Sequence, residues 1–264
     1  MIHLTAIIGS GAKIGANVEI GPHTLIGGGV TIGNDTVIGA NAVIEEEVTI
    51  GRGNQIGHGT MIGGAPQDVS FMEKTRSRVE IGDCNLIREY CTIHRGTAEG
   101  SATKIGDENF LMVGAHVGHN CVVGNKVIIA NNVLLGGYVS IGDQGFLGGG
   151  TTFHQNVRVG RLVIVQGNSA FSKDLPPFTL AAERNSVFGL NVIGLRRAGF
   201  SSVQREEIKR AFKLLYLSGL NTRQALERSR EMQWTQAGAE FFDFIEKTGK
   251  RGICPYRRHG SAED

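Results

Sequence analysis

The sequence predicts a parallel β-helix, an all-β solenoid, followed by a smaller helical domain. Three observations support this prediction. An apolar residue recurs at every sixth position over most of the chain. Glycine contributes 39 of the 264 residues and proline only 5, which indicates a repeat in which glycine has a fixed place. After the last repeat, the apolar residues take helical spacing instead.

The first repeats keep their period without interruption. Isoleucine recurs at every sixth position from Ile8 to Ile62, and glycine follows it everywhere except at Glu45. The residue two places before each isoleucine is small or β-branched in most units. Such a hexapeptide repeat is a signature of a parallel β-helix. Strand alternation turns both positions to the same side, and glycine permits the backbone to turn the corner between units.

Three units should form one triangular coil of 18 residues, and coils stack at a strand spacing of ~4.8 Å. Residues 18 apart then lie above one another, and their isoleucines fill a narrow interior. The period slips by one residue after Ile62, which predicts a loop near 64–79. It fails again at Glu99, which predicts a loop near 96–103, and then continues to Val165. Ordinary strands of a β-sandwich would not keep this phase over such a length. The period does not fix the handedness of the coil.

The second domain follows a clear break in the repeat. Pro176 and Pro177 end it, so we place the β-helix at 1–190 and a helical domain at 191–264. Apolar spacing predicts helices over 201–219, roughly 222–232 and roughly 237–247. From residue 201 onward there are 12 Lys and Arg against 9 Asp and Glu. This mildly basic balance suits either an acidic partner or an ordinary solvated surface.

Composition excludes several other classes of protein. A formal net charge of +2 argues neither for nor against nucleic-acid binding, but no aromatic and basic recognition pattern is visible, so we expect no nucleic-acid partner. No apolar run approaches the ~18 residues of a membrane span, and the N-terminus does not read as a signal peptide. The four cysteines have no CxxC spacing, which predicts a reduced, cytoplasmic setting.

Two histidines stand out in the segment VGAHVGHNCVVG, residues 113–124. His116 and His119 both occupy positions outside the inward-facing set. Stacking places His119, Gly137 and Gln155 on one edge, with His154 at a corner position where glycine is usual, all within ~10 Å. Histidine suits a general base, and a bare glycine N–H suits an oxyanion. Ordinary surface histidines and a zinc pair are the alternatives, although no third zinc ligand is evident.

Several segments together resemble a known family. They are TIHRGT (92–97), GAHVGHNC (114–121), IIANNVLLGGYVSIGD (128–143), FHQ (153–155), DLPPF (174–178) and FGLNVIGLRRAGF (188–200). They are similar to the acyl-ACP–UDP-N-acetylglucosamine O-acyltransferases of lipid A biosynthesis, and the likeness extends over nearly the whole chain.

The resemblance implies a left-handed β-helix in a cytoplasmic homotrimer, with active sites between neighbouring subunits. It implies transfer of an (R)-3-hydroxyacyl chain from acyl carrier protein to the 3-position of the UDP-sugar. Neither a metal nor a cofactor is implied, because the acyl donor is carried on the phosphopantetheine of the carrier protein. Acyl carrier proteins are acidic, which would explain a basic C-terminal domain.

The resemblance also implies residue roles. His119 matches the general base, and the Gly137 N–H matches the oxyanion donor. Residues that match sugar or acyl contacts are Asp68, His116, His154 and Gln155, and those that match nucleotide contacts are Asn191 and Arg197. Gly167 matches the position that limits acyl-chain length.

The sequence departs from the family pattern at five positions close to these residues. Asn120 stands where an aspartate neighbours the base, and Tyr138 where a histidine follows the oxyanion glycine. At the nucleotide end, Ser70 replaces a lysine, Ile193 a glutamate and Ala198 a basic residue. These changes motivate the hypothesis that the acceptor carries a 3-amino group and that the product is an amide.

Three further alternatives remain at this stage. One is the N-acyltransferase of the same pathway, which usually has an additional N-terminal domain, whereas the repeats here begin at Ile8. The second is a non-catalytic solenoid that serves as a scaffold. The third is the zinc enzyme that the histidine pair suggests.

Overall fold

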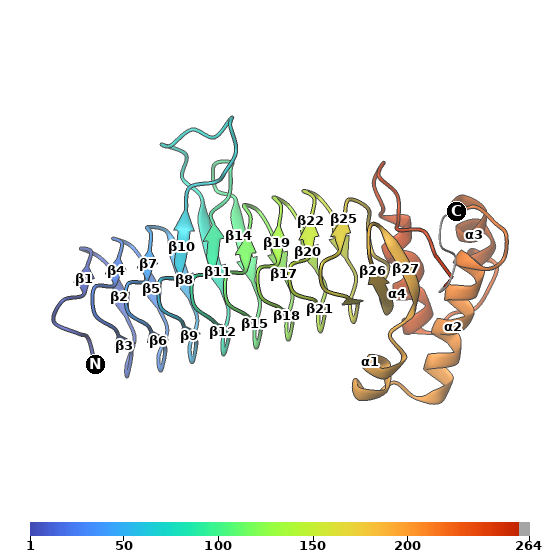
Figure 1. Cartoon of the computed structure of the whole chain (residues 1–264), viewed down its shortest axis with the longest axis horizontal. Coiled ribbons are helices and arrows are strands. Elements are labelled where there is room, and N and C mark those ends of the chain that lie inside the picture. The colour runs from blue at the N-terminus through green and yellow to red at the C-terminus, as the bar shows by residue number, and fades with distance from the viewer. Residues whose placement is uncertain (259–264) are drawn as a thin grey trace.

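The computed structural model describes residues 1–258 and has the shape of a long triangular prism with helices at its C-terminal end (Figure 1). The chain winds as a left-handed parallel β-helix, so the predicted solenoid is confirmed. Each coil contributes one short strand to each of three sheets, which form the three faces of the prism. We call them sheets A, B and C.

The strands follow one another around the prism in a regular rotation, with all pairings parallel except the last, between β26 and β27. Sheet B comprises β1 Ile7–Ile8, β4 Leu25–Ile26, β7 Val43–Ile44, β10 Met61–Gly64, β13 Thr92–His94, β16 His116–Val117, β19 Leu134–Leu135, β22 Thr152–Phe153 and β25 Ala170–Phe171. Sheet C comprises β2 Lys13–Ile14, β5 Thr31–Ile32, β8 Val48–Ile50, β11 Arg78–Ile81, β14 Ala102–Ile105, β17 Val122–Val123, β20 Ser140–Ile141 and β23 Arg158–Val159. Sheet A comprises β3 Glu19–Ile20, β6 Val37–Ile38, β9 Gln55–Ile56, β12 Leu86–Ile87, β15 Phe110–Leu111, β18 Ile128–Ile129, β21 Phe146–Leu147, β24 Ile164–Val165, β26 Thr179–Ala182 and β27 Ser186–Leu190.

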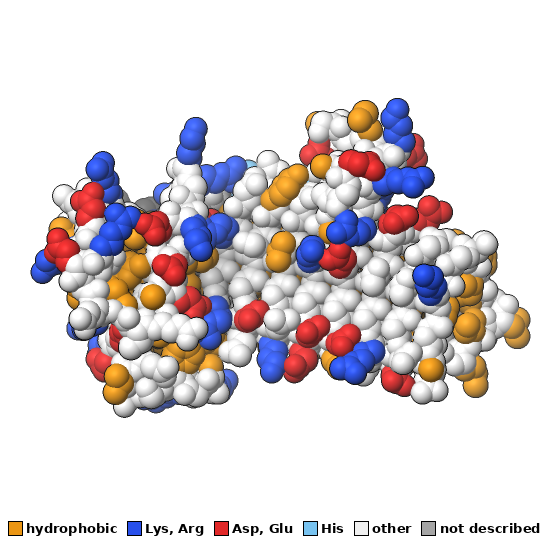
Figure 2. Space-filling view, turned by 180° about the vertical axis from the view of Figure 1, so that it is seen from behind, with side chains coloured by type: hydrophobic (Ala, Val, Ile, Leu, Met, Phe, Trp, Pro, Cys, Tyr) orange, Lys and Arg blue, Asp and Glu red, His pale blue; other side chains and the backbone are white. Residues whose placement is uncertain are grey.

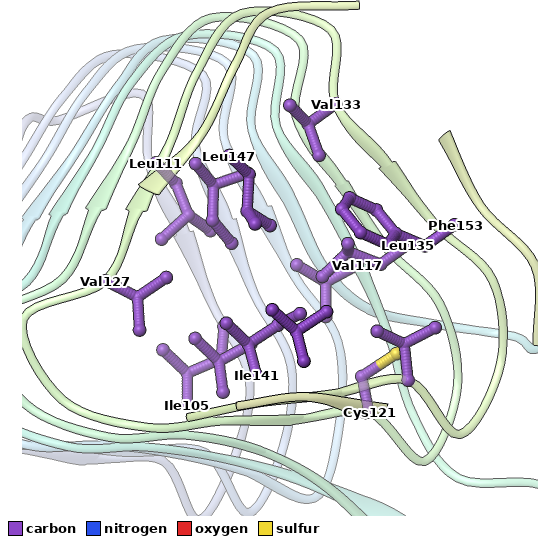
Figure 3. Close-up of a cluster of buried hydrophobic side chains, with 14 of the residues drawn as sticks. Ile105, Leu111, Val117, Cys121, Val127, Val133, Leu135, Ile141, Leu147 and Phe153 are labelled. Carbon is purple, nitrogen blue, oxygen red and sulfur yellow. The ribbon is translucent and has the colours of Figure 1, made fainter. Parts of the chain in front are cut away.

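The second residue of a typical strand points into the prism. Ile26, Ile44 and Ile62 are at most 1% exposed, because each is covered by the coils on both sides. Figure 3 shows the same arrangement later in the chain, where Ile105 and Ile141 lie in one row and Leu111 and Leu147 in another. Truncating one of these side chains would leave a cavity that neighbouring coils cannot close, at a typical cost of ~2–5 kcal/mol.

The glycine after each inward-facing isoleucine is needed for a different reason than the predicted one, which was backbone freedom at the corner. The residue in the left-handed conformation comes three places after the inward side chain, as at Asn17 (φ 58°) and Asn41 (φ 55°). Asparagine tolerates that conformation better than most residues. The glycine directly after the isoleucine is required for space instead. A Cβ on Gly21 would lie 2.7 Å from the Ala40 backbone nitrogen of the next coil.

Two loops leave the prism at the corner between sheets B and C (Figure 1). The longer loop spans 65–77, between β10 and β11, and the shorter spans 95–101, between β13 and β14. They support each other. The Arg95 guanidinium donates to the Thr75 carbonyl at 2.5 Å, and the Arg76 amide donates to a Glu99 carboxylate oxygen at 3.0 Å.

Up to residue 258, four helices follow β27: α1 Val192–Arg197, α2 Ser202–Tyr216, α3 Thr222–Arg230 and α4 Gln236–Glu246. The three helices predicted from apolar spacing are therefore confirmed, whereas the six-residue α1 was missed because it is too short to show a period. Ser201 begins α2 with a capping box that it shares with Gln204. Within the described residues, no helix is both long and apolar enough to cross a membrane. Residues 259–264, which the predicted helical domain includes, lie outside the described part of the chain.

Candidate active site

His119 lies at the corner between sheets B and C, two residues after the end of β16. Only 6% of its surface is exposed, so the alternative of an ordinary surface histidine was wrong. Tyr138, one coil further on, presses its ring edge-on against the imidazole, with a centroid distance of 5.3 Å. Gly137 leaves room for the same ring, because a Cβ there would lie 2.3 Å from Nε2.

The protonation pattern of His119 follows from its hydrogen bonds. The Thr97 backbone N–H, which can only donate, points to Asn120 Oδ1 at 3.0 Å. The same oxygen lies 3.0 Å from His119 Nδ1. Because Oδ1 can only accept, neutral His119 must carry its proton on Nδ1. Its Nε2 therefore keeps a free lone pair, which is the state a general base requires.

The two departures from the family pattern at this corner contact each other through the shorter loop. The Tyr138 hydroxyl lies 2.9 Å from Thr97 Oγ1, which in turn donates to Asn120 Oδ1 at 3.0 Å. Tyr138 adopts a left-handed backbone conformation (φ 61°), which is unfavourable for an aromatic residue. Its hydroxyl and ring contacts offset that cost. Asn120, Tyr138 and Thr97 thus form one network around His119.

The Gly137 amide is available to a ligand. At the equivalent place in several other corners, a side chain of the next coil caps the corner amide. Ala16 N donates to Asn34 Oδ1 and Ala40 N to His58 Nδ1, both at 2.9 Å. Among the described residues, the Gly137 N–H has no such acceptor. An unpartnered N–H beside the lone pair of a base suits a developing oxyanion.

A third histidine, His94, belongs to the same cluster, and the sequence analysis missed it. Its ring meets that of His116 edge-on, with centroids 4.9 Å apart. Burial lowers the pKa of His94 to about 4, with a further effect from the neighbouring histidines, and burial also lowers the pKa of His116. Both are therefore neutral at pH 7. His94 directly follows an inward-facing isoleucine, a position where the repeat usually has glycine. His154 was singled out because it occupies the same position in its own unit, so the same criterion could have identified His94.

These groups surround an open cavity of about 460 Å³. Its lining includes His94, His116, His119, Gly137, His154 and Gln155, with Gln67 from the longer loop. Asp68 follows Gln67 and accepts hydrogen bonds from the Ser70 hydroxyl at 2.6 Å and the Ser70 amide at 2.8 Å. These two bonds lower the pKa of the Asp68 carboxyl. Ser70, one of the departures, therefore orients a predicted contact residue.

Three predicted site residues lie elsewhere in the single chain. Asn191 caps α1, since its Oδ1 accepts from Gly194 N and its Nδ2 donates to the Leu162 carbonyl, both at 2.9 Å. Arg197 lies exposed in the last turn of the same helix. Gly167 lies at the corner between sheets A and B, where a Cβ would be 2.9 Å from the Gly149 carbonyl. None of the three lines the cavity around His119.

The arrangement of potential metal ligands and the state of the cysteines bear on the remaining alternatives. Within residues 1–258, no group of three or more His, Cys, Asp or Glu side chains is arranged to hold a metal ion. The four cysteines are all free thiols, and burial raises the pKa of Cys91 to about 11 and that of Cys121 to about 12.

Comparison with known proteins gives a consistent result. A family model described as UDP-N-acetylglucosamine O-acyltransferase, domain 2, matches residues 174–254, and a model of bacterial transferase hexapeptides matches 29–64 and 102–137. An acyl-[acyl-carrier-protein]–UDP-N-acetylglucosamine O-acyltransferase of Gloeothece citriformis is 43% identical over 198 residues, which cover 73% of this chain and 71% of the relative. The solved UDP-N-acetylglucosamine acyltransferase of Bacteroides fragilis is 43% identical, with a TM-score of 0.90 and 96% and 99% of the two chains covered. That of Campylobacter jejuni is 37% identical, with a TM-score of 0.91 and coverage of 97% and 100%.

Proposed function

Since the chain belongs to the family of acyl-ACP–UDP-N-acetylglucosamine O-acyltransferases, we propose that it carries out the family's reaction, the first step of lipid A biosynthesis. It is a transferase that moves an (R)-3-hydroxyacyl chain from acyl carrier protein to the 3-position of UDP-N-acetylglucosamine. The observation that carries this proposal is the pairing of the free His119 Nε2 lone pair with the unpartnered Gly137 N–H in one cavity.

The geometry supports a direct acyl transfer. His119 Nε2 takes the proton of the 3-hydroxyl as the oxygen attacks the thioester carbonyl. The carbonyl oxygen becomes an oxyanion and accepts a hydrogen bond from the Gly137 amide. When the intermediate collapses, the C–S bond breaks, and the imidazolium returns its proton to the departing phosphopantetheine thiolate. The residues need no metal or cofactor for these steps.

We propose that the active enzyme is a homotrimer. The outward side chains of sheets A and B are largely apolar, as at Phe146 (37% exposed) and Leu134 (46%), whereas sheet C presents Lys104 and Glu80. Figure 2 shows a side of the molecule on which basic and acidic side chains are spread along the β-helix. Packing sheet B of one subunit against sheet A of the next would bury the apolar faces around a three-fold axis.

A trimer would also complete the site. The cavity borders sheet B, and within one chain neither Asn191 nor Arg197 is among its lining residues. In the trimer, α1 of a neighbouring subunit would supply the nucleotide contacts, and the acyl chain would run across sheet B toward Gly167. A basic C-terminal domain would attract the acidic carrier protein. We propose a cytoplasmic location, which four free thiols favour.

The test is an acyl-transfer assay with the purified protein, 3-hydroxyacyl carrier proteins of several chain lengths, and product masses as the readout. UDP-N-acetylglucosamine and its 3-amino analogue both enter the assay, because the lone pair of His119 would accept a proton from either group. We expect transfer to the 3-hydroxyl. Faster transfer to the 3-amino sugar would establish the amide product instead, and no transfer to either sugar from a well-folded protein would refute the proposal.

A further inference from the structure

The chain returns to the β-helix after its last helix. This C-terminal strap, residues 248–257, follows α4 and runs beside the final coils (Figure 1). The Asp174 amide donates to the Gly252 carbonyl at 3.0 Å, and the Cys254 amide donates back to the Asp174 carbonyl at 2.8 Å. The Tyr216 hydroxyl of α2 donates to the Cys254 carbonyl at 3.0 Å. The strap is thus fixed to both domains.

Its position places Arg251 at the edge of the candidate active site. The guanidinium Nη1 lies 2.5 Å from His154 Nδ1 and donates to the Gln155 carbonyl at 3.0 Å. His154 and Gln155 both line the cavity that contains His119. Arg251 itself is exposed and lies 97 residues away in sequence from His154.

The contact determines which nitrogen of His154 carries the proton. Arginine remains protonated in proteins and can only donate, so His154 Nδ1 must accept and the proton must reside on Nε2. A competing arrangement exists, because Nδ1 also lies 3.2 Å from the Gln155 carbonyl and could donate to it if it carried the proton. Arg251 donates hydrogen bonds both to the Gln155 carbonyl and to the lone pair of His154 Nδ1. It thereby disfavours the tautomer in which Nδ1 carries the proton.

We propose that Arg251 is a positioning residue of the active site, which holds His154 as a hydrogen-bond donor through Nε2–H. The inference rests on the proposed function. It assigns opposite tasks to two histidines of one cavity: His119 accepts a proton at Nε2, and His154 donates a hydrogen bond to an oxygen of the bound substrate. It also links the helical domain to the chemistry, since the strap that carries Arg251 is anchored there.

Steady-state kinetics of Arg251→Met, His154→Gln and the double variant test this coupling. Losing a charge-assisted contact should lower kcat/KM about ten-fold in Arg251→Met. Because Arg251 acts through His154, the double variant should be no slower than His154→Gln alone. Additive losses would overturn the proposal. Lys250→Met is the matched control, since it removes the same charge from an exposed neighbour in the strap, and it should retain wild-type rates.

A spectroscopic readout separates positioning from a loss of stability. In protein labelled with ¹⁵N-histidine, the His154 signals, assigned by their absence in His154→Gln, should report a protonated Nε2 and an accepting Nδ1. Arg251→Met should shift them toward the other tautomer, and Arg251→Lys should partly restore them. Unchanged signals in Arg251→Met would refute the inference even while the wild type transfers acyl chains. Failure of wild-type transfer would instead refute the proposed function.

Discussion

At the residue scale, an amide oxygen orients His119, the proposed base, where the family resemblance leads us to expect a carboxylate. Asn120 Oδ1 accepts from His119 Nδ1 and from the Thr97 amide, each at 3.0 Å. An amide oxygen can fix the tautomer as a carboxylate does, but it adds no negative charge that would favour the imidazolium. The substitution therefore preserves the orientation of the base and changes its electrostatics.

This difference predicts the pH dependence of Asn120→Asp. A carboxylate beside His119 stabilises the protonated imidazole, so a higher pH is needed to obtain the free base. The acidic limb of the kcat/KM profile should shift to higher pH, and the plateau should stay within about ten-fold of the wild type. Rate–pH profiles of the two proteins check this. An unchanged limb, or one that shifts to lower pH, would contradict the role given to Asn120.

His94 makes a prediction about stability. Its pKa is lowered to about 4 in the folded protein, against ~6.5 for a free histidine, because burial disfavours its charged form. Between these two pH values, His94 binds more protons in the unfolded chain than in the folded protein. The contribution of His94 to the stability of the fold therefore falls as the pH falls from about 6.5 toward 4. His94→Gln should therefore lose less stability than the wild type between pH 7 and pH 5. Thermal unfolding at the two pH values, with the exposed His3→Gln as control, measures this.

The site residues that lie within the repeat could be predicted from the sequence, whereas those on the loop and on the C-terminal strap could not. The 18-residue stacking rule alone predicts that His119, Gly137 and Gln155 lie together. Thr97 could not be found in this way, because it lies on a loop outside the repeat, where sequence distance no longer gives position. The contact of Arg251 was equally inaccessible, since the path of the strap depends on how the helices pack.

At the element scale, a buried asparagine ladder joins successive coils at the entry to sheet A. Asn54 Oδ1 accepts from the Asn85 amide at 2.9 Å, Asn85 Oδ1 from the Asn109 amide at 2.9 Å, and Asn109 Oδ1 from the Val127 amide at 2.7 Å. All three asparagines are at most 1% exposed. The ladder satisfies backbone donors that would otherwise be buried without partners.

Asn85→Leu should interrupt the ladder in its middle. The substitution leaves the Asn109 amide without its acceptor, which costs about 1–3 kcal/mol of unfolding free energy for this buried donor. It also removes the Nδ2 donor to Asn54 Oδ1, although that oxygen keeps its bond from the backbone amide of residue 85. Gln55→Leu, on the outward side of the neighbouring strand in sheet A, is the control and should have little effect. Denaturant unfolding of the variants compares them, and equal stability of both would show that the ladder is unimportant.

The period predicted the strands well because each inward position is fixed by stacking rather than by local propensity. The role of the corner glycines was misjudged, since their requirement comes from the coil above, as at Gly21. Helices α2, α3 and α4 were predictable from their apolar faces. Helix α1 owes its start to the Asn191 side chain, which also bonds to the Leu162 carbonyl, a tertiary contact that no local pattern reveals.

At the scale of the whole molecule, the three faces of the prism differ in chemistry. Sheets A and B expose apolar side chains and sheet C exposes charged ones, which supports a trimer packed through A and B. The handedness of the coil was not predictable from the period and came from the family resemblance. In the proposed trimer, the position of Asn191 and Arg197 relative to the cavity likewise depends on neighbouring subunits, which one sequence does not place.

Phe146→Glu tests this assembly. A carboxylate on the outward side of β21 would be buried without a partner in the trimer, so we expect dissociation and a loss of transfer activity. Val122→Glu introduces the same group at a position with 47% exposure on sheet C and should leave the trimer intact. Light scattering after size-exclusion chromatography gives the masses. A trimeric Phe146→Glu protein would exclude the proposed packing of sheet A.

The central claim, that His119 is the general base, is tested most directly by single-turnover acyl transfer with wild type and His119→Ala. General-base catalysis contributes about 10²–10⁴-fold, so the variant should be slower by that factor while its trimer mass and melting temperature remain unchanged. A variant within ten-fold of the wild-type rate would mean that another group removes the proton, and the mechanism proposed for this cavity would be wrong.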